Sequence, residues 1–382
     1  MSPGVFNLPA GDVVKAHQRD LIWMMNHAIG GGVLPMWVGF NAKLTTDKLP
    51  QEVHYMPNLR QPITSLDVIN QTLITTQRCA RECNQEYGVV SYDLNAAKPA
   101  MQIQATEKPK VDDVFVMPGT FHVEMAFFKA LGKLVEVSGG ANMLNESDVL
   151  ATGSLNGFLT GKHFNRCKRL HPILALSFEV LHFLAFLECY EFKDEMTTIL
   201  SNLQPNTIAE EVETIVSSDI FAAGVAAYED YTQKTRSGVH GATAEYWMIY
   251  IDYVHQYHLL ERAIRTNDID MYINSLTGII DLFFATNHVN YSRWLTKFQL
   301  DLLNVEDSHP GLRDLLNQGV FAIHRTDKAF SRCPVDLTLE QTINADAASR
   351  LTGMSSVTDN YQARLRWMVT KSTRASLASQ LQ

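Results

Sequence analysis

The hydrophobic positions in the first part of the chain predict two strand-then-helix units. Ile69 and Leu73 recur at helical spacing, which predicts a helix that Gly88 stops. Two short apolar runs follow, at 89–93 and 113–117, and a stretch with helical spacing comes after each of them. Successive strand-then-helix units favour parallel pairing of their strands, so we expect a small α/β core in this region.

The rest of the chain has the apolar spacing of helices almost throughout. Residues 146–305 predict an all-α block, followed by one more strand at 320–324 and by helices at 335–351 and 360–369. The N-terminal part is rich in Gly and Pro, and only 13–29 looks helical there. The expected fold class is therefore mainly α, with a small α/β core and a large helical insertion.

The same patterns divide the chain into four expected parts. They are an irregular N-terminal segment (1–62), a strand-helix α/β core (63–145), the all-α block (146–305), and a C-terminal strand with helices that return to the core (306–382).

Composition indicates an ordinary globular protein. The 382 residues are 46% hydrophobic and 19% charged, and the formal net charge is −9 at pH 7. This balance excludes a surface that is basic all over, so any nucleic-acid contact would need a local basic stripe. The five cysteines are scattered and form no C-x-x-C pair, which is typical of a reducing, intracellular compartment.

We expect neither a secretory signal nor a membrane partner. The N-terminus lacks a basic segment followed by an apolar one. The longest apolar stretch, 173–187, is interrupted by Ser177, Glu179 and His182 and is shorter than a bilayer span.

Two candidate catalytic residues follow the two predicted strands of the core. Asp93 ends the first strand, where the carboxyl edge of an open α/β sheet places ligands, and it could hold a metal or act as a general base. His122 occupies the matching place after the second strand and could bind a metal or transfer protons. The alternatives are a helix cap for Asp93 and a hydrogen-bonded histidine at a helix start for His122.

A third group of polar residues lies near the C-terminus. Asp336, Glu340 and Asn344 are spaced at i, i+4 and i+8, so they would share one helix face. Oxygen ligands suit Mg²⁺ or Mn²⁺, and Asp93 with Asp336 or Glu340 would form such a site if the fold brings them together. The alternative is a solvated polar face.

The strongest basic feature is the segment 161–171. On a helix, Lys162, Arg166 and Arg169 would lie at i, i+4 and i+7 and could contact successive phosphates of DNA. His163 and His171 would flank them. The alternative is a basic face paired with neighbouring acidic helices.

Other motifs argue against several classes of site. Gly30-Gly31-Gly32 lacks the Lys-Ser/Thr of a phosphate-binding loop, and the chain contains no G-x-S-x-G elbow. His255 and His258 stand among tyrosines, and we interpret them as a polar stripe on a packed helix.

Several segments together resemble a multi-copy family of uncharacterised invertebrate proteins. They are Val89–Ala105, Pro118–Gly140, Gly157–His171, Arg293–Leu312 and Phe330–Arg350, so the similarity extends over most of the chain. The pattern is similar to transposon-derived proteins with an RNase H-like core, by analogy of fold.

The resemblance implies a set of metal-binding carboxylates. In such cores three carboxylates hold two metals for phosphoryl transfer. Asp93 would correspond to the second, and Glu340 or Asp336 to the third. No first-strand carboxylate can be named, and relatives carry further sequence upstream, so we expect a partial or inactive derivative.

The sequence thus supports two hypotheses. The first is a transposase-derived, RNase H-like protein that processes or binds DNA, with Asp93, Glu340 and His122 at its site and a nuclear location. The second is a non-catalytic helical scaffold that binds a protein partner.

Overall fold

The chain folds into two compact units, which are described one at a time. The computed structural model describes residues 12–30, 34–46, 51–54, 65–206, 208–324 and 326–341. The first unit, here called the helical unit, comprises residues 1–47, 124–293 and 328–330. The second, here called the α/β unit, comprises residues 48–123, 294–327 and 331–382. The helical unit thus includes the N-terminal residues as well as most of the expected all-α block.

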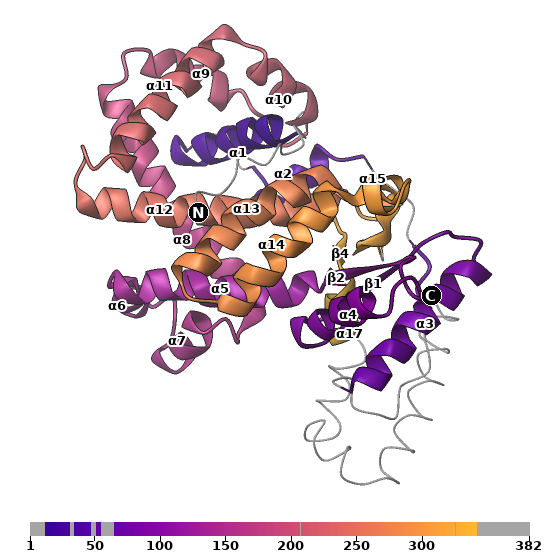
Figure 1. The fold of residues 1–382 in the computed structure, drawn as a ribbon. Coiled ribbons are helices and arrows are strands. Elements are labelled where there is room, and N and C mark those ends of the chain that lie inside the picture. Colours follow the sequence, from indigo (N-terminus) through magenta and orange to yellow (C-terminus); the bar gives the residue numbers. More distant parts are fainter. Residues whose placement is uncertain are drawn as a thin grey trace. The chain divides into compact units, whose positions relative to one another are not determined.

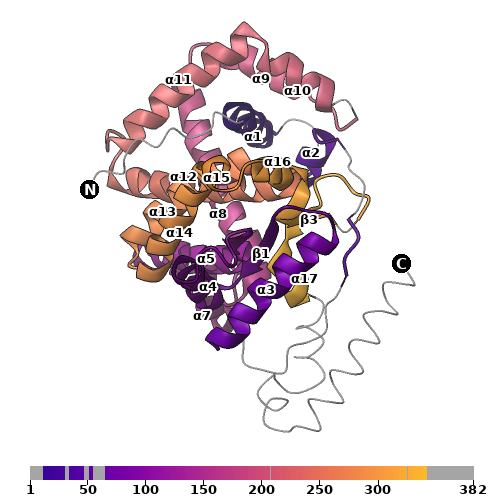
Figure 2. The same cartoon turned by 45° about the vertical axis from the view of Figure 1, so that its right-hand side comes forward.

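The helical unit buries its apolar side chains around α1. Figures 1 and 2 show α1 running along the inside of an arc formed by α9, α10 and α11. Ile22 and Met25 of α1 belong to the same core cluster as Phe40, Phe183 and Phe221, and all five are fully buried. The helices are α1 (Val13–Ala28), α2 (Trp37–Lys43), α6 (Gly140–Glu146), α7 (Thr152–Leu159), α8 (Phe164–Cys189), α9 (Lys193–Ser201), α10 (Ile208–Val216), α11 (Asp219–Arg236), α12 (Ala242–Thr266) and α13 (Ile269–Ala285).

α8 is longer than the apolar run that the sequence shows. By length and composition it is the one helix of the described residues that could cross a membrane, with a mean hydropathy of 1.7 over an 18-residue window of which 39% is buried. Phe183 and Phe186 of α8 lie in the core of the helical unit, and Glu179 is buried as well. A core helix has these contacts, so its length is weak evidence for a membrane span.

The α/β unit is built on a two-stranded parallel sheet. β1 pairs with β2 from Gly88↔Val114 to Tyr92↔Pro118. Side chains alternate between faces in a strand, and Val114 and Val116 pack with Ile69, Leu73 and the alanines of α4 on one face. The elements are α3 (Leu66–Glu82), β1 (Gly88–Tyr92), α4 (Leu94–Thr106), β2 (Val114–Pro118), α15 (Val305–Ser308), α16 (Leu312–Leu315), η1 (Leu316–Val320), β3 (Ala322–Ile323), β4 (Cys333–Pro334) and α17 (Val335–Leu339).

Two helices continue across the division between the units. These are α5 (Thr120–Val137), whose first residues belong to the α/β unit, and α14 (Val289–Leu303), whose last residues belong to it.

The structure confirms that the protein is mainly helical with small sheets, and it corrects several details. The helix expected to stop at Gly88 ends at Glu82, because Asn84 adopts a left-handed conformation (φ 56°), and Gly88 is the first residue of β1. The strand expected at 320–324 comprises only Ala322–Ile323 in the structure, where it pairs antiparallel with β4. α2 was not predicted. The expected helix at 335–351 is seen as α17, and positions 342–382, with Asn344 and the helix at 360–369, lie outside the described residues.

Candidate functional site

A carboxylate from the C-terminal part of the α/β unit binds the start of α5. Asp336 Oδ1 accepts a hydrogen bond from the backbone N–H of Phe121 at 3.1 Å, and Oδ2 accepts one from the N–H of His122 at 3.3 Å. Oδ2 also lies 3.0 Å from Nδ1 of His122. The first N–H groups of a helix have no partner within the helix, and a negative charge is favoured at that end, so Asp336 stabilises the N-terminus of α5.

Gly119 makes this approach sterically feasible. A Cβ at position 119 would overlap Oδ2 of Asp336 and would lie 3.1 Å from the carbonyl oxygen of Tyr92. The N–H of Gly119 donates to that same carbonyl at 2.5 Å. The residue between β2 and α5 must therefore lack a side chain, which the sequence shows only as a Pro-Gly turn.

The other two acidic candidates face the same histidine. The hydrogen bond that the His122 ring donates to Asp336 raises the pKa of His122 above its ordinary value, against the effect of partial burial. The charges of Asp336, Asp93 and Glu340 add to the rise. Asp93 also caps α4, since its Oδ1 accepts from the N–H of Ala96 at 3.0 Å. The cap that was the alternative for Asp93 is therefore present.

Within the described residues, the ligands predicted for Mg²⁺ or Mn²⁺ are not arranged as a metal site. Among the described ranges, no group of three or more His, Cys, Asp or Glu side chains is arranged to hold a metal ion. Both oxygens of Asp336 accept hydrogen bonds from N–H donors, and one oxygen of Asp93 accepts the bond of a helix cap. These residues thus do not fit a metal as they lie, and metal binding stays a prediction.

The basic segment is exposed, but it is not one continuous helical stripe. α8 begins at Phe164, so Lys162 precedes the helix and only Arg166 and Arg169 lie on it. All three are exposed, and within the described residues none of them forms an ion pair with a carboxylate. The predicted placement of all three residues at i, i+4 and i+7 on one helix is therefore wrong. The alternative, a basic face paired with acidic helices, is not seen among the described residues either.

The neighbouring residues of the segment have different roles. Lys168 is bound to Glu261 at 2.7 Å. Burial would lower the pKa of Lys168, but the carboxylates of Glu261 and Glu124 outweigh that effect and raise it. His171 is fully buried, stacked against Phe158 at 4.5 Å between ring centroids, and burial lowers its pKa to about 3. His171 therefore does not flank a phosphate site.

A fourth exposed cation was missed in the sequence. Gly161 adopts a left-handed conformation (φ 73°) and lies against α5, so that a Cβ placed there would be 3.3 Å from Cβ of Lys129. Lys129 is exposed and stands beside the segment that carries Lys162. No local pattern signals this, because 33 positions separate the two lysines along the chain. We call Lys129, Lys162, Arg166 and Arg169 the basic patch.

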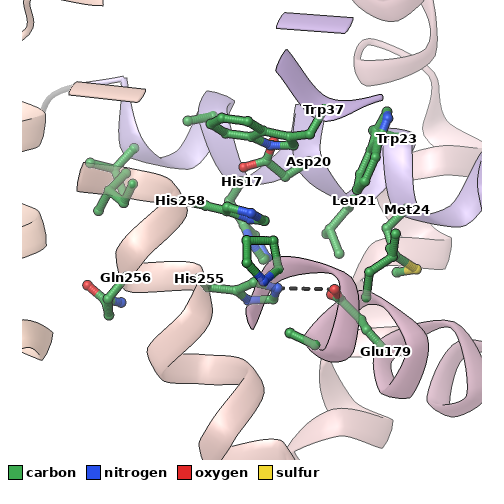
Figure 3. Close-up of a pocket in the computed structure, with 16 residues that line it drawn as sticks. His17, Asp20, Leu21, Trp23, Met24, Trp37, Glu179, His255, Gln256 and His258 are labelled. Carbon is green, nitrogen blue, oxygen red and sulfur yellow. Dashed lines mark hydrogen bonds and ion pairs between the residues drawn. The ribbon is translucent and has the colours of Figure 1, made fainter. Parts of the chain in front are cut away.

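A cavity in the helical unit gathers polar residues that sequence reasoning also missed. It has a volume of about 160 Å³ and lies among α1, α8, α12 and Trp37 (Figure 3). His255 and His258, interpreted above as a stripe on a packed helix, line it together with His17 of α1. The i, i+3 spacing of the α12 histidines was a usable signal, but their partner His17 is far away in the sequence.

Opposite charges in this cavity are paired. His255 Nε2 lies 3.1 Å from Oε2 of Glu179. Burial would lower the pKa of His255, but the charge and hydrogen bond of Glu179 raise it to about 9. Asp20 accepts hydrogen bonds from Arg262 and, at 2.7 Å, from Nε1 of Trp37. Burial works against ionisation of Asp20, and the Arg262 charge still holds its pKa below the ordinary value.

His258 and His17 differ from His255 in their charge state. Burial lowers the pKa of His258 to about 4. His17 keeps an exposed fraction, and desolvation of the part that lines the cavity, together with the charge of His255, lowers its pKa. Both rings are therefore neutral at pH 7. The ring of His258 stacks on Trp37, with centroids 4.6 Å apart and planes 13° apart.

The protein is thus mainly helical with a parallel βαβ element, and its described residues include three polar groups: the Asp336–His122 pair, the basic patch and the histidines of the cavity. The family described as a domain of unknown function, DUF8702, matches residues 36–382. The chain belongs to this family. No curated protein and no solved structure matches it.

Proposed function

We propose that this protein binds nucleic acid through the basic patch. The observation that carries the proposal is the exposure of Lys162, Arg166 and Arg169 without carboxylate partners among the described residues. The chain has a net charge of −9, and Lys168, a half-buried cation of the same segment, pairs with Glu261. Neighbouring exposed cations without carboxylate partners are suited to the phosphates of a polyanion.

The position of the patch strengthens this argument. Arg166 and Arg169 lie in the first turns of α8, a helix of 26 residues with no acidic residue in its first turn. A cation in the first turn, as Arg166 is, is disfavoured by the positive end of the helix dipole by roughly 0.3–1 kcal/mol, whereas Arg169 lies beyond that turn. A bound phosphate removes this cost, since both the cations and the helix N-terminus attract it.

The proposal includes an origin in an RNase H-like domain. The order of elements supports it, because β1, α4 and the parallel β2 are followed by a long helical stretch and then by the return of Asp336 to the start of α5. Since Asp93 and Asp336 are engaged in capping, we propose binding rather than metal-dependent cleavage.

The salt dependence of binding tests the proposal. Fluorescence anisotropy with a DNA duplex and with a single-stranded RNA would be measured between 50 and 200 mM KCl, a range over which phosphate-binding proteins lose affinity steeply. Replacing Lys162, Arg166 and Arg169 by alanine should reduce the slope of log K against log salt by about 3, since each phosphate that a cation neutralises on B-DNA adds roughly 0.9 to the slope.

A control of equal charge separates the patch from the overall charge. Arg78, Arg81 and Lys110 each pair with a carboxylate, and their triple alanine variant should keep the wild-type slope. An unchanged slope in the patch variant, or an equal reduction in the control, would contradict the proposal. If neither nucleic acid binds at 50 mM salt, a helical protein-interaction scaffold is the better account.

A further inference from the structure

The cavity of the helical unit has the size of one aromatic ring. Its volume of about 160 Å³ is close to that of an engineered protein cavity of about 150 Å³ that binds benzene. Part of its wall is apolar, formed by Leu21, Met24, Leu176 and Leu259. A ligand with flat apolar faces would be suited to this wall.

The charges of the cavity favour an uncharged ligand. Glu179 is balanced by His255, and Asp20 by Arg262, so each ion already has its partner. A charged ligand would bring a further ion into a partly buried site and leave it uncompensated, which is costly.

The two neutral histidines offer hydrogen bonds. Among the residues that the structure describes, neither His17 nor His258 makes a side-chain hydrogen bond to another residue. A neutral imidazole carries one donor and one acceptor. Stacking on Trp37 fixes the plane of His258, and the ring of His17, which also lines the cavity, lies 6.3 Å from that of His255 between centroids.

We propose that this cavity binds an uncharged nitrogen heterocycle of about one ring, which hydrogen-bonds to His258 and His17 while its faces lie against the apolar wall. The ligand must carry both an N–H donor and an acceptor. A pyrimidine-type base has this chemistry. The site is separate from the basic patch, so ligand binding in the cavity can be tested independently of nucleic-acid binding through that patch.

Four ring compounds of similar size test the ligand class on the full chain. Uracil is neutral with donors and acceptors, benzene is apolar, benzoate is an anion and benzylamine is a cation. Binding would be followed by ligand-detected NMR and by calorimetry, and a small ligand of this size should reach a dissociation constant of about 1 mM or tighter. Uracil should bind at least about tenfold more tightly than each of the other three.

Two variants locate the site. His258→Phe keeps a ring over Trp37 but removes both nitrogens, so uracil binding should weaken at least about tenfold while benzene binding is kept. His17→Ala removes the second partner at an exposed position, so it gives the same readout if His258→Phe does not fold. His54→Phe, an exposed histidine of the α/β unit, should change nothing.

Several outcomes would overturn this inference. They are the absence of uracil binding at about 10 mM, tighter binding of benzoate, benzylamine or benzene than of uracil, and unchanged uracil binding in both cavity variants.

Discussion

Oδ2 of Asp336 lies 3.0 Å from Nδ1 of His122, although 214 positions separate the two residues. This contact, with the backbone hydrogen bonds from Phe121 and His122, anchors α17 to the start of α5 within the α/β unit. A carboxylate from far along the chain thus takes the role that a local N-cap residue has in most helices.

Asp336→Ala should destabilise the protein. The variant removes a buried carboxylate, 8% exposed, that accepts three hydrogen bonds, and it leaves backbone donors of α5 without a partner. The expected decrease in the free energy of unfolding is about 1–3 kcal/mol, measured by urea denaturation. As a control, Asp301→Ala removes an exposed ion pair with Lys297 and should cost no more than about 0.5 kcal/mol. Equal costs would argue against the anchoring role of Asp336.

Asp93→Ala should show the cost of removing a helix cap. Its Oδ1 accepts from the N–H of Ala96, and such caps contribute about 0.5–2 kcal/mol. Asp93→Asn keeps an acceptor and should be neutral within a few tenths of a kcal/mol, since Asn is an equally good cap. The comparison requires denaturation curves for both variants, with and without Mn²⁺. A stabilisation by Mn²⁺ that Asp93→Asn abolishes would instead support the predicted cation site.

Gly132→Ala should disrupt the packing of α5 against α7 within the helical unit. A Cβ at position 132 would overlap the carbonyl oxygen of Leu159, and that backbone cannot move as a flexible side chain would. Overpacking of this kind costs about 1–3 kcal/mol. Gly153→Ala in α7 is the matched control, because nothing lies within 4 Å of the added Cβ and the helix gains a better former. The control should be neutral or more stable by up to about 1 kcal/mol, as judged by thermal melting.

The ion pair of Glu179 and His255 should make stability depend on pH. The folded state raises the pKa of His255 from 6.5 to about 9, so the stabilisation is complete below about pH 6.5 and is lost as pH rises through about 9. The difference in unfolding free energy between the wild type and His255→Gln should therefore shrink over this window. Asp252, Asp20, His17 and His258 also face His255, and its measured pKa includes their effects.

An NMR titration of the imidazole signals checks this assignment directly. His255 should titrate near pH 9 in the wild type and closer to its ordinary value in Glu179→Gln, whereas His258 should stay neutral down to about pH 4. A His255 titration that is unchanged in Glu179→Gln would show that Glu179 is not the cause.

The sequence by itself determined the local elements of this protein. Apolar spacing located α1, the strands β1 and β2 and the long helical block. The residues that a helix or strand buries recur with the period of that element, and this period is visible in the sequence. It also offered a helix cap as the alternative to the predicted metal or catalytic role of Asp93, and it singled out the exposed cations of the segment that leads into α8. These features depend on neighbours within a few positions, which a sequence displays.

Only the tertiary structure decided which distant residues meet. Asp336 reaches His122, Lys129 stands beside Gly161, and His17 lines a cavity with His255, each across a long stretch of chain. From the sequence, we interpreted the histidines of α12 as ordinary packing residues, because an i, i+3 pair has the same spacing whether it faces a core or a cavity. The physical reason is that burial, pKa and ion pairing depend on which helices pack together, and one sequence does not specify that packing through local periodicity.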